Sequence, residues 1–202
     1  VAERLGFDFL DTGAMYRAIG LEALRREANL EDPRELAFVA RYCRIAFDFG
    51  ARPPQVFLNG KPVGHLLRSA QATRAASYVA VVPAIRAQLV EQQQRIGRER
   101  QNLVSEGRDQ GTVVFPGAEC KFFFEADRME RARRRLAESK ERGDTRSTLE
   151  SILAEQDRRD LRDAGRDNSP MAPAADAIHI DTTDLTPEQV LDRLEMEVRK
   201  CP

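Results

Sequence analysis

Short apolar segments alternate along this chain with longer segments of helical periodicity, and this alternation constrains the fold more than any other feature. Four short apolar runs are predicted to be strands, at 7–10, 102–105, 121–124 and 177–180. The segments between them are helical in pattern and include 14–30, 66–81, 85–100, 129–142 and 149–164. Because parallel strands need such long crossovers, we predict an α/β fold with a parallel, doubly wound sheet flanked by helices.

Local turn and cap signals add detail to this pattern. Alternating residues flank Asn59-Gly60, a dipeptide typical of hairpin turns, so residues 44–65 are predicted to form a small β insertion. The segment Thr186-Pro187-Glu188-Gln189 has the pattern of a capping box, which predicts the start of a final amphipathic helix. Residues 1–5 look like the last turns of a helix, and Gly6 is a suitable stop.

Composition narrows the class of protein. The chain has 202 residues, of which 42% are hydrophobic and 32% charged, and a formal net charge of −1. No basic field argues for nucleic acid as a partner, and the absence of a long apolar run or signal-peptide pattern argues against membrane insertion and secretion. Cys43, Cys120 and Cys201 are scattered and form no CxxC pair. We therefore predict reduced thiols in a cytoplasmic protein.

The segment 106–112 directly follows a predicted strand and carries the most informative side chains. Ligands of open α/β sheets bind beyond the carboxyl ends of the strands, where Glu106, Arg108 and Asp109 would lie. Arg108 could clamp a phosphate and Asp109 could accept hydrogen bonds from an amine. The residue types alone are equally compatible with a polar turn that holds a local ion pair.

Two other segments have polar side chains in similar settings. Residues 10–17 follow a predicted strand and place Arg17 near a helix N-terminus, which suits a phosphate, although a capped helix with a solvated arginine has the same pattern. Arg159, Asp163 and Arg166 fall at i, i+4 and i+7 and share one helical face. That face could bind an anion and a sugar, or it could be a surface ladder of ion pairs.

Taken together, these motifs resemble the bacterial cytidylate kinase family over essentially the whole chain. The matching segments are Leu-Asp-Thr-Gly-Ala-Met-Tyr-Arg (10–17), Arg-Ala-Ala-Ser (74–77), Glu-Gly-Arg-Asp-x-Gly-Thr-Val-Val-Phe-Pro (106–116), Arg-Asp-x-x-Asp-x-x-Arg (159–166), Pro-Ala-Ala-Asp-Ala (173–177) and Ile-Asp-Thr-Thr-x-Leu-Thr-x-Glu-Gln-Val (180–190). The resemblance implies a P-loop nucleoside-monophosphate-kinase fold. It also implies transfer of the γ-phosphoryl group of ATP, with Mg²⁺, to CMP or dCMP.

The resemblance also implies a role for particular positions of the acceptor site. Ser77, Arg86 and Asp109 match the residues that read the cytosine edge. The acceptor phosphate would be held by Arg17, Arg108 and Arg166, the ribose side by Arg159 and Asp163, and Thr12 replaces a serine of some members. Glu106 would orient a magnesium-bound water, and Arg131, Arg134 and Arg135 are expected to neutralise the transferring group. A solvated helical face remains an alternative for some arginines of that cluster.

The implied architecture is a single domain with three parts. Its core would comprise 1–30, 82–128 and 167–202, the nucleotide-monophosphate-binding arm with the β insertion 31–81, and the lid with its flanking helices 129–166. The expected partners are the small nucleotides CMP, dCMP and ATP. We expect a monomer that binds neither nucleic acid nor membrane.

The sequence departs from the family's pattern in one respect. The family begins with a strand and a Gly-x-x-x-x-Gly-Lys-Gly/Ser-Thr phosphate loop, and the 202 residues contain neither. We therefore expect a truncated chain without a donor site, inactive by itself. Three alternatives stay open: an inactive CMP-binding regulatory module, a kinase for UMP or dTMP, and a nucleic-acid-binding role for the arginine cluster. Three acids on the same helix, Glu130, Glu138 and Glu141, argue against the last of these.

Overall fold

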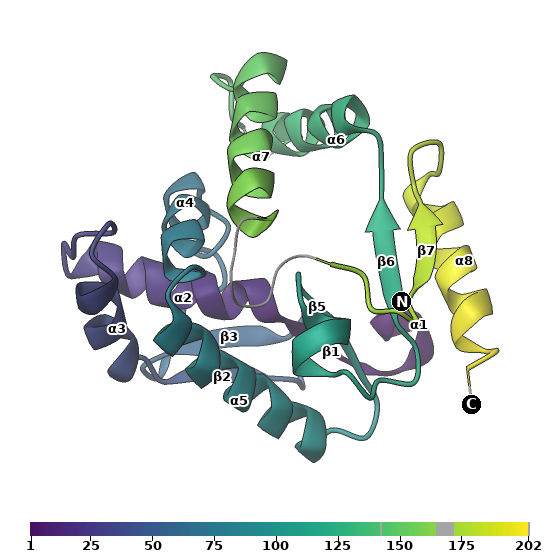
Figure 1. Ribbon diagram of the computed structural model, residues 1–202, viewed down its shortest axis with the longest axis horizontal. Coiled ribbons are helices and arrows are strands. Elements are labelled where there is room, and N and C mark those ends of the chain that lie inside the picture. Colours follow the sequence, from purple (N-terminus) through teal and green to yellow (C-terminus); the bar gives the residue numbers. More distant parts are fainter. Residues whose placement is uncertain (142, 165–171, 202) are drawn as a thin grey trace. The chain divides into compact units, whose positions relative to one another are not determined.

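The computed structural model describes residues 1–141, 143–164 and 172–201 (Figure 1). The chain divides into two compact units, residues 1–114 and 115–202, which are described separately below. Parallel strands and helices occur in both units, as the α/β prediction requires. The described residues contain two separate two-stranded parallel sheets, one in each unit, where the sequence predicts one continuous sheet.

In the first unit, two parallel strands end at the same edge. Strand β1 (Asp8–Asp11) pairs in register with β5 (Leu103–Glu106), so that Asp11 lies opposite Glu106. The short helix α1 (Ala2–Leu5) precedes β1 and ends at Gly6, whose φ of 69° lies in the left-handed region that favours glycine. The predicted helix end is therefore confirmed.

Four longer helices complete this unit, and two of them approach each other very closely. The helices are α2 (Thr12–Arg25), α3 (Pro33–Arg41), α4 (Ala70–Val79) and α5 (Pro83–Glu99). A Cβ atom at Gly20 of α2 would lie 2.9 Å from Cβ of Ala75 in α4, so a glycine is what permits this contact. The largest fully buried side chains here include Met15, Ile19, Leu36, Leu58, Ile85 and Leu89.

A small antiparallel sheet packs into the same core. It consists of β2 (Ile45–Asp48), β3 (Gln55–Leu58) and β4 (Lys61–Pro62), joined in that order. Asn59 and Gly60 connect β3 to β4 with φ angles of 51° and 77°, and positive φ at both central residues is the requirement of a type I′ turn. The predicted hairpin at Asn-Gly is confirmed.

Two helix boundaries differ from the predictions, for local reasons. Helix α2 ends at Arg25 rather than near residue 30, because Glu27 adopts a left-handed φ of 54°. Helix α4 begins at Ala70 rather than at 66, because the Ser69 hydroxyl accepts from the Ala72 amide at 3.2 Å and caps the helix there.

The second unit is built on the other parallel pair. Strand β6 (Phe122–Glu125) lies beside β7 (Ile178–Asp181), with helices α6 (Arg128–Glu141), α7 (Leu149–Ala164) and α8 (Pro187–Val198). Helix α8 starts in the predicted capping box: the Gln189 amide donates to Thr186 Oγ1 at 3.3 Å, and the Thr186 amide donates to Gln189 Oε1 at 2.8 Å. That prediction is confirmed.

The cysteine prediction is wrong for two of the three residues. Cys120 and Cys201 form a disulfide, with their Cα atoms 6.0 Å apart, while Cys43 is a free, buried thiol. Cys120 precedes β6 and Cys201 follows α8, and the two are 81 positions apart in sequence. No sequence pattern predicts that these two segments come close enough for a disulfide. Burial raises the pKa of the Cys43 thiol to about 12, so this group is chemically inert near neutral pH.

Among the described helices, none combines the length and apolar character needed to span a bilayer.

Candidate functional site

The candidate site lies in the first unit, at the edge where β1 and β5 end. Strand β1 runs directly into α2 at Thr12, so the N-terminus of this helix lies at the carboxyl edge of the sheet. The register of the two strands places Asp11 beside Glu106, and the loop 107–109 follows. A helix N-terminus at such an edge favours anions, because free backbone amides and the positive end of the helix dipole both point there.

Arg17 is held at this helix N-terminus by a carboxylate. Asp11 caps α2 by accepting from the Ala14 amide at 2.8 Å, and its second oxygen accepts from Nη2 of Arg17 at 2.5 Å. Nε of Arg17 is buried and has no hydrogen-bond partner within the described part of the chain. The guanidinium therefore has a fixed position at the helix N-terminus and remains 22% exposed, an arrangement that suits a phosphate group.

Arg86 and Asp109 form a buried ion pair. Each residue is only 6% exposed, and Nη2 of Arg86 donates to Oδ2 of Asp109. Nη1 of Arg86 also donates to the Ala80 carbonyl at 3.1 Å, and the guanidinium lies 5.7 Å from the ring centroid of Tyr16. The alternative considered for 106–112 was a local ion pair, whereas this pair joins Asp109 to a residue 23 positions earlier, on α5. A fixed acceptor beside a fixed donor can read the polar edge of a base.

Close packing joins the two loops of the site. Thr12 Oγ1 donates to the Glu106 carbonyl at 2.6 Å, which links the start of α2 to the end of β5. A Cβ atom at Gly107 would lie 2.4 Å from Thr12 Oγ1 and 2.6 Å from Nε2 of Gln110. Only a glycine therefore fits between these side chains.

Glu106 has a perturbed carboxyl group. Burial of the carboxyl raises its pKa, the nearby charge of Asp11 raises it further, and the charge of Arg17 opposes both. A bound cation would stabilise the ionised form of this carboxyl group.

The raised pKa of Glu106 predicts how stability depends on pH. A carboxyl whose pKa is higher in the folded state binds more protons there, so its contribution to stability falls as pH rises from the unfolded pKa through the folded pKa. Glu106→Gln should therefore give a higher urea unfolding midpoint than the wild type at pH 7. The difference should shrink as the pH falls to the unfolded pKa and below. The exposed Glu31, replaced in the same way, is the control, and an unchanged or lower midpoint for Glu106→Gln at pH 7 would contradict the expectation.

The remaining predicted residues of the first unit have simpler surroundings. Ser77 lies on α4, where its hydroxyl donates to the Arg74 carbonyl at 2.7 Å. Arg108 is half-buried in the loop after β5. The structure thus brings Thr12, Arg17 and Glu106 together at one edge and joins Arg86 to Asp109.

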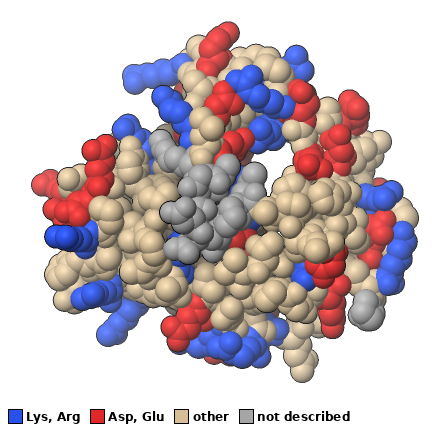
Figure 2. Space-filling view, in the orientation of Figure 1, with Lys and Arg blue, Asp and Glu red and all other residues tan. Residues whose placement is uncertain are grey.

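Other predicted site residues belong to the second unit or lie outside the residues that the structure describes. Arg159 and Asp163 lie in α7 by their backbone, but their side chains are outside the described residues, as is Arg166 altogether. Arg131 donates to Asp160 of α7 at 2.8 Å, and Arg135 pairs with Glu138 at 2.7 Å. In Figure 2, acidic and basic side chains lie next to one another over α6 and α7.

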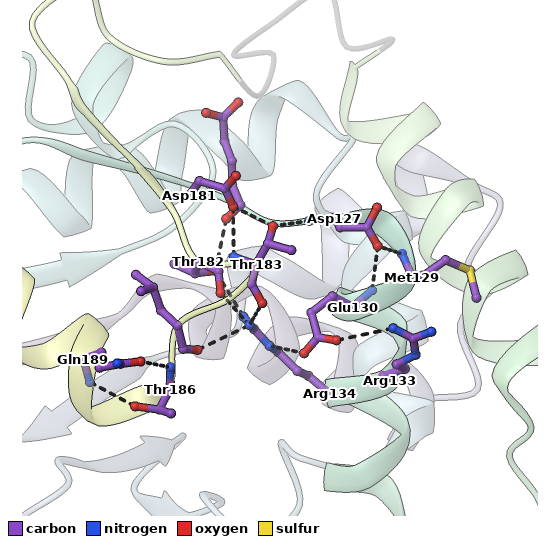
Figure 3. Close-up of polar contacts among 12 residues, drawn as sticks. Asp127, Met129, Glu130, Arg133, Arg134, Asp181, Thr182, Thr183, Thr186 and Gln189 are labelled. Atoms are coloured by element: carbon purple, nitrogen blue, oxygen red, sulfur yellow. Dashed lines mark hydrogen bonds and ion pairs between the residues drawn. The ribbon is translucent and has the colours of Figure 1, made fainter.

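Arg134 of the arginine cluster contacts the segment that follows β7 (Figure 3). Its Nη2 donates to the carbonyls of Thr182, at 2.5 Å, and Thr183, at 3.0 Å, while Nε donates to Glu130 at 3.0 Å. These contacts anchor α6 to the segment that follows β7. Arg134 thus has a structural function here that sequence reasoning did not foresee.

Sequence reasoning also missed two glutamines beside the site. Gln110 and Gln93 are linked by a hydrogen bond of 3.4 Å, and Gln93 is only 1% exposed. Gln110 begins a short π-helix, Gln110–Val114, where the sequence reads as an irregular turn. The only local signal is that Gln93 lies seven residues after Arg86, on the same face of α5.

Comparison with known proteins identifies the family. A sequence model described as "Cytidylate kinase" matches residues 1–200. The cytidylate kinase of Caldanaerobacter subterraneus subsp. tengcongensis is 45% identical over 200 residues, which cover 99% of this chain and 87% of that protein. Those of Limosilactobacillus reuteri and Citrifermentans bemidjiense are 38% and 40% identical over 200 residues, covering 99% of this chain and 87% and 85% of their own lengths. This chain therefore belongs to the cytidylate kinase family.

Proposed function

We propose that this protein transfers the γ-phosphoryl group of ATP to CMP or dCMP, giving ADP and CDP or dCDP. Membership of the cytidylate kinase family supports the reaction class. The single observation that carries the acceptor assignment is the buried pair of Arg86 and Asp109, whose guanidinium lies 5.7 Å from the ring centroid of Tyr16 on α2. It supplies a donor and an acceptor for a base within the same unit that supplies an anion site.

The proposal gives each part of the acceptor a set of residues. The exocyclic amine of cytosine donates to Asp109, and the ring acceptors receive hydrogen bonds from Arg86 and Ser77. Arg17 binds the phosphate from the helix N-terminus, where its guanidinium is already held by Asp11. Arg108 and Arg166 also bind the phosphate, and Arg159 and Asp163 bind the ribose side. The residues that neutralise the transferring group are Arg131, Arg134 and Arg135.

Magnesium suits the chemistry of Glu106. Mg²⁺ is commonly held by one or two carboxylates together with water and substrate phosphates. The described residues contain no group of three or more His, Cys, Asp or Glu side chains that could hold a metal alone. Bound through water at Glu106, the ion would neutralise phosphate charge.

The sequence contains no Gly-x-x-x-x-Gly-Lys-Ser/Thr motif, so no residue of this chain is assigned to the phosphates of ATP.

The parts of the domain and the cellular setting are proposed as follows. Residues 31–81 form the nucleotide-monophosphate-binding arm and residues 129–166 the lid, and the protein acts as a cytoplasmic monomer. Calorimetric titration with CMP, dCMP, UMP, dTMP, AMP and GMP tests the acceptor assignment. We expect CMP and dCMP to bind most tightly, whereas equal affinity for UMP would refute the reading of the cytosine edge.

Removing the Arg17 guanidinium should separate the phosphate from the nucleoside. Arg17→Ala is expected to weaken CMP binding by about 10- to 100-fold, the change that follows from losing one charge-assisted hydrogen bond. Cytidine, which has no phosphate, should bind both proteins alike. Calorimetry with both ligands measures this. Arg25→Ala, at the other end of α2, is the matched control, and an equal loss for cytidine and CMP would place Arg17 elsewhere in the site.

A further inference from the structure

A single amide side chain connects three elements around the candidate site. Oε1 of Gln110 accepts from the hydroxyl of Ser105 on β5 at 2.6 Å. Nε2 of Gln110 lies 3.4 Å from Thr12 Oγ1, at the start of α2, and 3.4 Å from Oε1 of Gln93, on α5. Gln110 therefore contacts a strand and two helices through one planar group.

The same group bounds the loop that carries the acceptor residues. Gly107 passes so close to Gln110 that a Cβ atom there would lie 2.6 Å from Nε2. The carbonyl of Asp109 accepts from the amides of Val113 and Val114, at 2.9 and 3.2 Å, so the π-helix holds the end of the loop as well. The path of residues 107–109 is thus set from both sides.

Helix α5 contacts this loop at two points on one face. Arg86 pairs with Asp109, and Gln93, seven residues later, accepts from Gln110. Because residues i and i+7 lie on one face of a helix, the same face of α5 contacts both Asp109, at the end of the loop, and Gln110, at the start of the π-helix. A displacement of Gln110 would therefore be transmitted to the neighbouring Asp109.

We infer that Gln110 is a positioning residue of the acceptor site. Its amide holds the 107–109 loop against Thr12 and α5, so that Asp109 and the α2 N-terminus keep a constant spacing. Gln110 acts through these neighbours and does not touch the nucleotide. The inference rests on the proposed function for the identity of the ligand, but the spacing that it describes is a property of the protein alone.

Hydrogen exchange of the nucleotide-free chain tests the positioning directly. Gln110→Leu should speed amide exchange about tenfold in residues 12–14 and 107–112, because local opening of the loop becomes easier. Gln88→Leu is the control: Gln88 also lies on α5 and donates one hydrogen bond, of 3.3 Å, to the Ala40 carbonyl. It should leave exchange in those residues unchanged. Unaltered exchange in Gln110→Leu would overturn the inference.

Affinity and its pH profile separate positioning from a general loss of structure. Gln110→Leu should raise the Kd for CMP about tenfold, as expected for one lost hydrogen bond. The urea unfolding midpoint of the second unit should stay at the wild-type value. Gln110→Glu keeps the acceptor but lacks the donor until its carboxyl is protonated. The ratio of its Kd to that of the wild type should therefore fall as the pH falls, and a ratio independent of pH would overturn the inference.

The exchange and binding experiments together distinguish a failure of the inference from a failure of the proposed function. If wild-type protein binds no CMP, the proposed function fails, and the exchange experiment alone decides the role of Gln110. Loss of CMP affinity with unchanged exchange would indicate direct contact with the nucleotide and would contradict positioning.

Discussion

Replacing Arg86 with methionine should lower the free energy of unfolding by about 3–5 kcal/mol, the usual effect of breaking a buried ion pair, and should abolish measurable CMP binding. The reason lies in Asp109, which is 6% exposed and would keep a buried carboxylate without its counter-charge. Urea unfolding followed by circular dichroism measures the first effect, and calorimetric titration with CMP measures the second.

A double variant separates stability from recognition. Arg86→Met combined with Asp109→Leu removes both charges, so most of the lost stability should return, whereas CMP binding should not. Arg25→Met is the surface control: Arg25 pairs with Glu22 at 3.9 Å and is 42% exposed, so its loss should change stability by less than about 1 kcal/mol. A double variant as unstable as the single one would show that the pair is not the cause.

Removing the Cys120–Cys201 disulfide should have the second largest effect. Cys201→Ser is expected to lower the free energy of unfolding of residues 115–202 by about 2–4 kcal/mol. The cross-link spans 81 residues of sequence, so it removes many conformations from the unfolded chain. Urea unfolding under oxidising and reducing conditions measures this. Wild-type protein treated with a dithiol reductant should behave like Cys201→Ser.

Cys43 provides an internal control for the thiol chemistry. Its thiol is buried and its pKa is raised to about 12, so a thiol reagent should label no cysteine in the native oxidised protein and one cysteine after denaturation. The variant Cys120→Ser/Cys201→Ser should be insensitive to the reductant. Three reactive thiols in the denatured, oxidised protein would contradict the disulfide and restore the reduced state that the sequence suggested.

Local chemistry made several elements predictable. The type I′ turn at Asn59-Gly60, the capping box at Thr186 and the helix stop at Gly6 each depend on a few neighbouring residues. The order of strands and helices followed from hydrophobic periodicity, which is also local. The end of α2 did not, because the left-handed conformation of Glu27 is one that few non-glycine residues adopt and no sequence pattern announces it.

The candidate site divides in the same way. Asp11 as a helix cap, and the gathering of Arg17 and Glu106 at one edge, could be expected from strands that end before polar turns. The partners of these residues could not be predicted. Arg86 and Asp109 are 23 positions apart, Gln93 and Gln110 are 17 apart, and Arg134 is 48 and 49 positions from the two carbonyls that it contacts after β7. Charged side chains are numerous, so the residue types leave many pairings equally possible.

The α/β class, the order of the elements, their turn chemistry and, through the motifs, the family could all be predicted from the amino-acid sequence. These properties depend on backbone preferences and hydrophobic spacing that act within about ten residues. The disulfide, the buried Arg86–Asp109 pair, the π-helix and the amide contacts of Gln110 could not be predicted in this way and became visible in the three-dimensional structure. Each of these depends on which distant segments pack together, and that choice is made by the whole core, whose close packing leaves room for one arrangement of neighbours.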